Sequence, residues 1–365
     1  MKKIPLAKPD LSGNEIKYVN EVIAKQGRIS SSGYYLDKFE GMAARRFKRK
    51  FALSCSNGTT ALHLALLSLG IGPGDEVIVP TMTFAACAAA IVYCGARPVF
   101  IDSNLQDWTI DVLQLDAKKT SRTRAVLAVD LYGMPANYDI LPAWCKKNKI
   151  YLIEDAAEAH GACFAGKPVG SFGQVSCFSF YGNKVLTTGE GGVCLTDDKA
   201  LYNRMKVLKN HGMRSAGLYD HDIVGFNYRL TNLQAAIGCA QFERFNEFLA
   251  KREQLDRWYH EFLGGTEEII FQKYDQKKIS PVCWLFSCVV KKNSQLIRSK
   301  LTGKGIENRA FFKPLHLQKP YKRYCLNQKF PKAEYLYKHG LTLPAFIDLT
   351  KREIKRISDY LLASF

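Results

Sequence analysis

The chain has 365 residues, of which 47% are hydrophobic and 24% are charged. That composition is typical of a globular protein and provides enough apolar residues for one large domain and a smaller one. The most apolar segment stops at Gly95, well short of a membrane span, and the N-terminal residues lack an apolar run of signal-peptide length. We therefore expect a cytoplasmic protein that does not bind a membrane.

The formal charge of +18 implies attraction to anions. The densest basic cluster is RRFKRK at residues 45–50, but the other basic residues are spread along the chain. Zinc-finger and RNA-binding signatures are missing. We interpret the cluster as a solvated helix end, expect no nucleic-acid partner, and note that a phosphorylated small molecule would respond to the same charge.

The eleven cysteines are scattered, and no C-x2-C pair occurs among them. Several, including Cys87, Cys177 and Cys194, lie in apolar contexts. This pattern predicts reduced core thiols in place of a disulfide framework. The seven histidines show no spacing typical of metal ligands, so we expect no metal site.

From about residue 50, apolar runs of strand length alternate with helical patterns. Strands are expected at 51–55, 75–80, 96–102, 123–130 and 149–155, with helices at 59–70, 83–95, 111–117 and 138–148. Continuous apolar strands that alternate with helices predict an α/β fold with a mainly parallel sheet covered on both faces. Such connections bring the carboxyl ends of the strands to one edge, where ligands bind.

Two further strands at 173–180 and 191–198 precede a change to helices, at 198–209 and 231–258. The later region has fewer signals, although 283–290 is typical of a strand and the last fifteen residues of a helix. We predict a large α/β domain at 1–245 and a smaller C-terminal α+β domain at 246–365.

The first strand-end loop, SNGTTALHLAL, has the composition of a phosphate site. Gly58 permits a tight turn, and Thr59 and Thr60 stand at a helix N-terminus that offers N–H groups and hydroxyls. A plain threonine N-cap is the alternative and is the more common arrangement when the motif occurs alone.

Three other loops carry different chemical groups. Asp155 ends an apolar strand, where a buried carboxylate needs a cationic or proton-donating partner; a helix cap is the alternative. Ser179 and Lys184 leave the next strand within FSFYGNKVLTTGEGG, although a lone lysine is usually solvated. Asn227 and Arg229 precede a helix within GFNYRLTNLQAAIG. Together the four loops supply the phosphate donors, carboxylate and amine that pyridoxal 5′-phosphate (PLP) requires.

Four blocks of the sequence resemble the DegT/DnrJ/EryC1/StrS family of sugar aminotransferases, and the resemblance runs from about residue 4 to the end. The blocks are SNGTTALHLALLSLGIGPGDEVIVPTMTF, EDAAEAHGA, FSFYGNKVLTTGEGG and FNYRLTNLQAAIG, in that order. Any one of them would be weak, but the ordered set is specific. The resemblance implies the fold of aspartate aminotransferase (fold type I), with a large mixed, mostly parallel sheet domain and a smaller C-terminal domain.

The resemblance also assigns roles toward PLP. It implies that Lys184 forms the imine with the cofactor and later moves the proton, and that Asp155 pairs with the pyridinium nitrogen. It implies that Ser179 and the loop containing Gly58, Thr59 and Thr60 hold the phosphate.

Three further cofactor contacts are implied by the same resemblance. Phe84 would lie against the pyridine face, and Asn227 would reach the phosphate in the neighbouring subunit, which implies a homodimer or a higher homo-oligomer. Glu158 departs from the glutamine of many relatives. A carboxylate beside the phenolic oxygen is repulsive unless it is protonated or paired, yet glutamate at this position fits the branch that forms GDP-perosamine.

Candidate substrate contacts come from the segment GRISSSG at residues 27–33, from the fourth block and from the segment FFKPLH. They are Arg28, Ser30, Arg229, Lys313 and His316. Arg28 replaces a tryptophan of many relatives, and it either pairs with the sugar diphosphate or is simply exposed. His160 and His211 map near the site, where we expect structural roles.

The resemblance implies transamination from L-glutamate to a nucleotide-linked 4-keto-6-deoxyhexose, with GDP-4-keto-6-deoxy-D-mannose giving GDP-perosamine for a surface polysaccharide. A UDP- or dTDP-linked keto sugar, or amination at C3, is the enzymatic alternative. The dehydratases of this fold replace the imine lysine with histidine, whereas this chain retains Lys184. A non-catalytic regulator or nucleic-acid binder is the alternative from another class, and it predicts salt-sensitive DNA binding without a spectral response to an amino donor.

Overall fold

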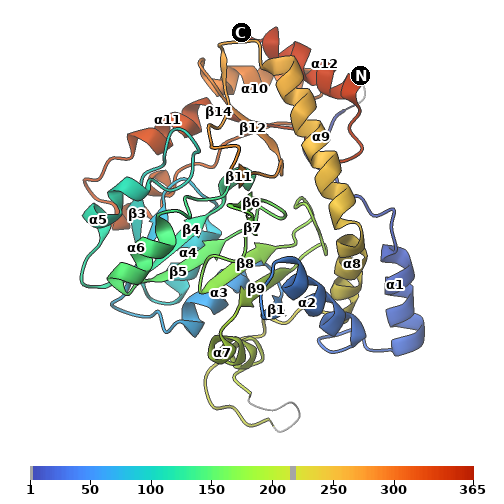
Figure 1. Ribbon diagram of the computed structural model, residues 1–365, viewed down its shortest axis with the longest axis vertical. Coiled ribbons are helices and arrows are strands. Elements are labelled where there is room, and N and C mark those ends of the chain that lie inside the picture. The colour runs from blue at the N-terminus through green and yellow to red at the C-terminus, as the bar shows by residue number, and fades with distance from the viewer. Residues whose placement is uncertain (1–2, 214–218) are drawn as a thin grey trace.

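A computed structural model describes residues 3–213 and 219–365 of the protein. Its centre is a seven-stranded mixed sheet (Figure 1). In spatial order the strands are β1 (Phe51–Cys55), β9 (Gly192–Thr196), β8 (Val175–Ser179), β5 (Tyr151–Asp155), β4 (Thr123–Val129), β2 (Glu76–Pro80) and β3 (Arg97–Ile101). All seven fall within the segments that the sequence predicts as strands.

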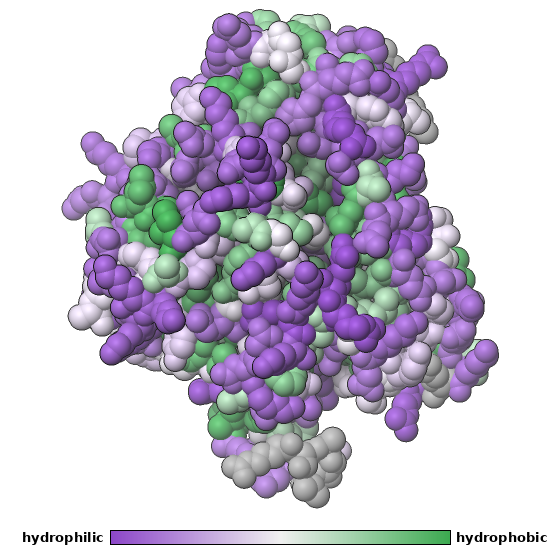
Figure 2. Space-filling model, in the orientation of Figure 1, coloured by the Kyte–Doolittle hydropathy of each residue, from purple (hydrophilic) through white to green (hydrophobic). Residues whose placement is uncertain are grey.

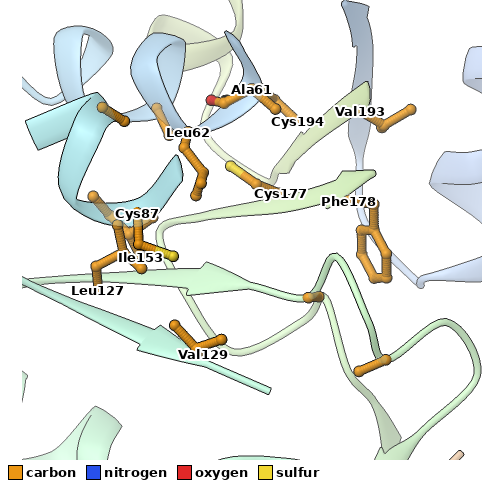
Figure 3. Packing of buried hydrophobic residues seen from close by; sticks show 14 of the residues in the cluster. Ala61, Leu62, Cys87, Leu127, Val129, Ile153, Cys177, Phe178, Val193 and Cys194 are labelled. Carbon is orange, nitrogen blue, oxygen red and sulfur yellow. Dashed lines mark hydrogen bonds between the residues drawn. The ribbon is translucent and has the colours of Figure 1, made fainter. Parts of the chain in front are cut away.

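The sheet is buried on both faces, as predicted. Along β2, Val77 and Val79 belong to one apolar cluster, whereas Ile78 belongs to another. Because successive side chains of a strand point to opposite faces, both faces of the sheet are covered. Figure 3 shows the packing of the first cluster, in which Cys87 lies close to Ile153 of β5.

The helices α3 (Gly58–Ser68), α4 (Ala86–Tyr93), α6 (Leu141–Asn148) and α7 (Lys199–Lys209) agree with the predicted order, and the turns η2 (Val112–Gln114) and α5 (Leu115–Lys118) take the place of the helix expected at 111–117. The helix α2 (Tyr34–Arg46) and the turn η3 (Leu131–Gly133) were not given ranges by the sequence analysis. Ahead of them come α1 (Glu15–Glu21) and η1 (Val22–Gln26). One prediction was wrong: the single helix expected at 231–258 is two helices, α8 (Asn232–Glu243) and α9 (Phe245–Leu263), because Arg244 leaves the helical conformation with φ −103° and ψ 9°.

A second, four-stranded antiparallel sheet forms after α9. It contains β10 (Ile269–Ile270), β12 (Phe286–Val290), β14 (Gly340–Leu343) and β13 (Arg309–Ala310). Around it lie α10 (Ser294–Gly303), α11 (Pro331–His339) and α12 (Lys351–Leu362), whereas the turns η4 (Leu315–Leu317) and η5 (Lys322–Tyr324) lie at the β2 and β3 end of the large sheet. This sheet has an apolar cluster of its own, which Leu255, Tyr259 and Leu263 of α9 join.

A small third sheet connects the two parts of the chain. It joins β6 (Cys163–Phe164) and β7 (Lys167–Pro168) to β11 (Ile279–Ser280). The domain boundary between residues 245 and 246 therefore stays a prediction, since β11 lies beyond it in sequence and pairs with strands from before it.

The prediction for the cysteines is confirmed, whereas the prediction for the basic cluster at 45–50 is only partly correct. All eleven cysteines are free thiols, as predicted, and nine of them are buried. The basic cluster at 45–50, however, is not wholly a solvated helix end: Phe47 is part of the core, and buried Arg49 donates to the Gly173 carbonyl at 2.9 Å.

The visible surface is mostly hydrophilic, with smaller apolar patches between the charged side chains (Figure 2). Within the ranges 3–213 and 219–365, no helix combines the length and the hydropathy that crossing a bilayer would require.

The direction of the strands decides where the site lies. β8, β5, β4, β2 and β3 are parallel, and β1 runs in the same direction because it and β8 are both antiparallel to β9. The segments that follow β1, β2, β4, β5 and β8 therefore leave the sheet at one edge, as the sequence predicts for a ligand site.

Candidate active site

Lys184 follows β8 and is largely enclosed, with 11% of its side chain exposed. Its Nζ lies 3.5 Å from Glu158 Oε1 and 4.0 Å from the centroid of the Trp284 ring. A carboxylate and an aromatic face both attract an ammonium group. Lys184 is therefore not the solvated loop lysine that its residue type alone would suggest.

Asp155, the last residue of β5, is buried and has only modest donors. Its Oδ1 accepts from the Ala157 N–H at 3.1 Å, and its Oδ2 accepts from Cys87 Sγ at 3.0 Å. Burial raises the pKa of Asp155, which these two hydrogen bonds and the charge of Lys184 partly offset. A thiol is a weak donor, so the carboxylate would be stabilised further by a protonated ring nitrogen.

Glu158 is buried three residues farther along the chain. Its Oε2 accepts from the Tyr132 N–H at 2.9 Å, while Oε1 faces Lys184. Burial raises the pKa of Glu158, and the opposing charge of Lys184 lowers it. Tyr132 has a φ of +55°, an uncommon conformation for a side chain of its size, and its bond to Glu158 holds the backbone there.

The first loop and the end of β8 meet at Gly58 and Ser179. A Cβ on Gly58 would lie 2.9 Å from Ser179 Cβ, so glycine is what allows the helix α3 to begin beside this serine. The first N–H groups of a helix have no partner within it, which leaves those of Gly58 and Thr59 available beside the Ser179 hydroxyl. That donor set fits a phosphate group.

Thr60 was expected to contact a phosphate, and in the structure it forms hydrogen bonds within its own loop. Its N–H donates to Asn57 Oδ1 at 2.9 Å, and its hydroxyl donates to the Asn57 carbonyl at 2.8 Å. Asn57 is therefore the N-cap of α3, in a capping box with Thr60. The N–H and the hydroxyl of Thr60, which the sequence analysis considered as phosphate donors, therefore already have partners within the loop.

The side chains of Phe84 and Asn227 are exposed. Phe84 is 58% exposed, and its ring centroid is 5.7 Å from that of Phe312. Asn227 is exposed, and its Oδ1 accepts from Arg229 Nε at 2.8 Å. Arg229 also bonds to Asn210 and contacts the ring nitrogen of His211 at 3.2 Å. Arg229 thus anchors this loop within its own chain.

The other candidate substrate residues do not converge on Lys184 by any described contact. Arg28, Ser30 and Lys313 have exposed side chains, and the backbone carbonyls of Arg28 and Ser30 accept from Asn232. His316 is buried, with Nδ1 2.7 Å from Thr81 Oγ1 and Nε2 3.3 Å from Glu334 Oε1. His316 thus ties its segment to the end of β2.

His160 is buried among aromatic rings. Its ring centroid lies 4.9 Å from that of Phe178 and 5.1 Å from that of Phe180, and burial lowers its pKa to about 3. Within the described part of the chain neither ring nitrogen has a hydrogen-bond partner. It packs as a neutral ring in the core.

The structure therefore brings together one amine, two buried carboxylates and a helix N-terminus with a serine, all at the edge that the strand directions define. Sequence reasoning missed Tyr132 and Trp284, which contact Glu158 and Lys184, and treated Cys87 only as a core thiol. Residues 9–362 match the model of the DegT/DnrJ/EryC1/StrS aminotransferase family.

The chain belongs to the DegT/DnrJ/EryC1/StrS aminotransferase family. It is 40% identical over 356 residues to a GDP-perosamine synthase of Escherichia coli O157:H7, covering 97% of this chain and 96% of that protein. It is 41% identical over 359 residues to a GDP-perosamine synthase of Caulobacter vibrioides, with the same coverage. Among solved structures, a putative sugar aminotransferase of Streptococcus pneumoniae in its PLP form superposes with a TM-score of 0.93 at 26% identity, covering 100% of this chain and 98% of the other.

The family membership confirms the predicted fold and identifies the chain as a PLP-dependent sugar nucleotide aminotransferase. The residues at the site fit this cofactor on their own chemistry. Among the residues that the structure describes, Asp155 has no cationic hydrogen-bond partner, and the space that a Cβ on Gly58 would fill lies against Ser179. The individual roles of these residues remain proposals.

Proposed function

We propose that the protein transfers an amino group from L-glutamate to the C4 keto group of GDP-4-keto-6-deoxy-D-mannose, which gives GDP-perosamine. The observation that carries the reaction type is the enclosed Lys184 between Glu158 and Trp284, on the same sheet edge as Asp155. The choice of sugar nucleotide rests on the near-complete alignment with two GDP-perosamine synthases.

PLP, when bound, supplies an electron sink for the charge that develops at the amino carbon. In this chain Asp155 would hold the ring nitrogen, and the N–H groups of Gly58 and Thr59 with the Ser179 hydroxyl would hold the phosphate. Lys184 is the amine that would take the proton from the amino carbon and return it. Glu158 and Trp284 keep that amine in place.

The test uses holoenzyme and separates the two half-reactions. L-glutamate is added first, and the visible absorbance of the cofactor should fall. The sample is then divided and given GDP-4-keto-6-deoxymannose or its UDP-linked counterpart, and the band should return only with the GDP sugar. If the band returned with the UDP-linked sugar alone, the enzyme would act on a UDP sugar in place of a GDP sugar. If the band never fell with glutamate, L-glutamate would not be the amino donor.

We further propose that the enzyme is a cytoplasmic homodimer in which Asn227 completes the neighbouring subunit's site. The support is that Asn227 is exposed and fixed by Arg229 while making no described contact with Lys184. Subunits of K184A and N227A, each impaired alone, should regain activity when unfolded and refolded together, because a mixed dimer has one site with both residues. No gain in the mixture, with mixed dimers verified by mass, would contradict the shared site.

A further inference from the structure

We propose that Trp284 is a positioning residue for Lys184, and that Arg252 fixes Trp284 from the long helix α9. This inference rests on the proposed function only in taking Lys184 as the reacting amine. It concerns a residue that follows Lys184 by one hundred positions and reaches it from the other side of the site.

Trp284 holds the lysine at two points. Its Nε1–H donates to the carbonyl of Asn183, the residue before Lys184, at 2.7 Å. The face of its ring lies 4.0 Å from Lys184 Nζ. The indole is only 3% exposed, so these contacts are made away from water, where both are strongest. One side chain thus fixes the backbone of the lysine and the position of its amine.

Arg252 in turn fixes the backbone of Trp284. Its guanidinium is buried in α9 and donates to the carbonyls of Cys283 at 2.9 Å and Trp284 at 2.7 Å. Within residues 3–213 and 219–365 it forms no salt bridge with a carboxylate, and burial lowers its pKa to about 10. Burying an unpaired guanidinium is costly. In this position the guanidinium holds the backbone of residues 283–284 in place.

A large cavity lies beside this segment, and Tyr132 also lines it. It has a volume of about 1120 Å³ and lies between α9 and residues 271–287. Val282, Cys283 and Leu285 line it, whereas Trp284 does not. The tryptophan alone of these four is turned to the lysine, and without Arg252 the segment has room to shift into the cavity.

Tyr132 completes the arrangement. Its ring is nearly parallel to that of Trp284, with an interplanar angle of 8° and centroids 6.5 Å apart, and its N–H donates to Glu158. Glu158 and Trp284, which both contact Lys184 Nζ, are therefore linked to each other through Tyr132. Displacing Trp284 is expected to disturb the amine without removing any group that binds the cofactor's phosphate or ring nitrogen.

Two substitutions separate the contacts. W284F keeps an aromatic face but loses the bond to Asn183, and W284L loses both. The first measurement is the rate at which apoprotein bonds PLP through Lys184, trapped by borohydride and counted by mass, which needs neither amino donor nor sugar. We expect this rate to fall about tenfold in W284F and about a hundredfold in W284L, since small misplacements of a reacting group have effects of that size.

The matched control is W144F. Trp144 also donates its Nε1–H, to Asp116 at 2.9 Å, but it lies in α6. It should lower stability slightly and leave the trapping rate unchanged. The kcat of the W284 variants with glutamate should fall with the trapping rate, while the KM for the sugar nucleotide stays within twofold.

R252M tests the second link. It removes the buried charge at similar volume but leaves the carbonyls of Cys283 and Trp284 without this donor, and an unsatisfied buried acceptor costs about 1–3 kcal/mol. Its folded state is therefore verified by thermal unfolding before the trapping rate is measured, and it should slow trapping about as much as W284F. The proposal is overturned if W284L traps PLP at the parental rate, or if R252M does so. If neither the parent nor any variant responded to glutamate, the proposed function would be contradicted. The trapping result would still hold, because that assay uses no amino donor.

Discussion

Cys87, which Figure 3 shows beside Ile153, donates its thiol to Asp155 Oδ2 over 3.0 Å. Thr83 Oγ1 lies 3.3 Å from the same sulfur. The carboxylate proposed for the ring nitrogen is therefore held through a fully buried thiol. The hydrogen bond from Cys87 lowers the pKa of Asp155, although burial raises it by more.

Removing this thiol should move the acid limb of the pH profile. In C87A the charged form of Asp155 loses a donor, so its pKa rises further and the carboxylate becomes protonated at a higher pH. The decline of kcat on the acid side should then begin at higher pH than in the parent, and C87S should reverse the change because a hydroxyl is the stronger donor. The half-reaction with glutamate, measured from pH 5 to 9, checks this.

Cys145 offers the control for C87A. It is another buried thiol, in α6, and has no hydrogen bond to a carboxylate in the described ranges. C145A should lose about as much stability as C87A, but its kcat should decline on the acid side at the same pH as that of the parent. Superimposable limbs in C87A and the parent would show that the thiol does not influence Asp155.

Glu158 should make the stability of the apoprotein fall as pH rises. Its folded-state pKa is raised, chiefly by burial, so the folded state binds the proton more tightly than the unfolded state. Stability from this group is present below its unfolded pKa, near 4.3, and is lost as pH rises through the folded value. E158Q removes that loss and can still accept from the Tyr132 N–H. The Tm of E158Q relative to the parent should therefore increase from pH 4.5 upward.

Thermal unfolding of both apoproteins at several pH values tests the Glu158 prediction. E267Q is the control, because the Glu267 side chain is 97% exposed, and its Tm difference from the parent should not vary with pH. A constant difference for E158Q across the range would contradict a raised pKa.

Gly58 should be required for cofactor binding more than for folding. An added Cβ would lie 2.9 Å from Ser179 Cβ and 3.3 Å from its hydroxyl, so G58A must separate the two sides of the proposed phosphate site. Overpacking of this kind costs about 1–3 kcal/mol, and we expect PLP affinity to fall at least tenfold, measured by equilibrium titration of apoprotein.

G303A is the matched control for that titration. Gly303 is in α10, and a Cβ there would meet nothing within 4 Å. It should leave PLP affinity unchanged and raise helix stability slightly, since alanine is the better helix former. Unchanged affinity in G58A would place the phosphate elsewhere.

The sequence was sufficient for the parts of the fold and site that depend on local pattern. Apolar strands and strand-end residues predicted the parallel sheet and the edge at which Asp155, Ser179 and Lys184 leave it. Trp284 could not be found in this way, since its bond to Asn183 spans 101 positions and its own segment has the pattern of an ordinary strand. The capping bond between Thr60 and Asn57 was not foreseen because a threonine beside a glycine is typical of a phosphate loop and of a helix cap alike. The helix break at Arg244 was not foreseen because it carries neither proline nor glycine.

Replacing Lys184 should affect stability and activity through separable contacts. K184Q removes the amine, so activity should fall about 10²–10⁴-fold, as for other general bases. It also leaves Glu158 buried beside an uncharged group. Breaking a buried pair on one side can cost about 3 kcal/mol, whereas replacing both partners is often neutral. We therefore expect K184Q to lower the Tm of the apoprotein at pH 7, and K184Q/E158Q to recover it without recovering activity.

Lys209 and Glu40 form the matched control pair. Their Nζ–Oε1 distance is 3.4 Å, and their side chains are 16% and 20% exposed, compared with 11% and 7% for Lys184 and Glu158. K209Q should lower the Tm by less than K184Q does, because Glu40 Oε1 keeps hydrogen bonds from the Ser54 N–H and hydroxyl, and it should keep most of the activity. If K184Q/E158Q were no more stable than K184Q, the ion pair between Lys184 and Glu158 would not be the source of the loss, and packing of the lysine stem against Trp284 would account for it instead.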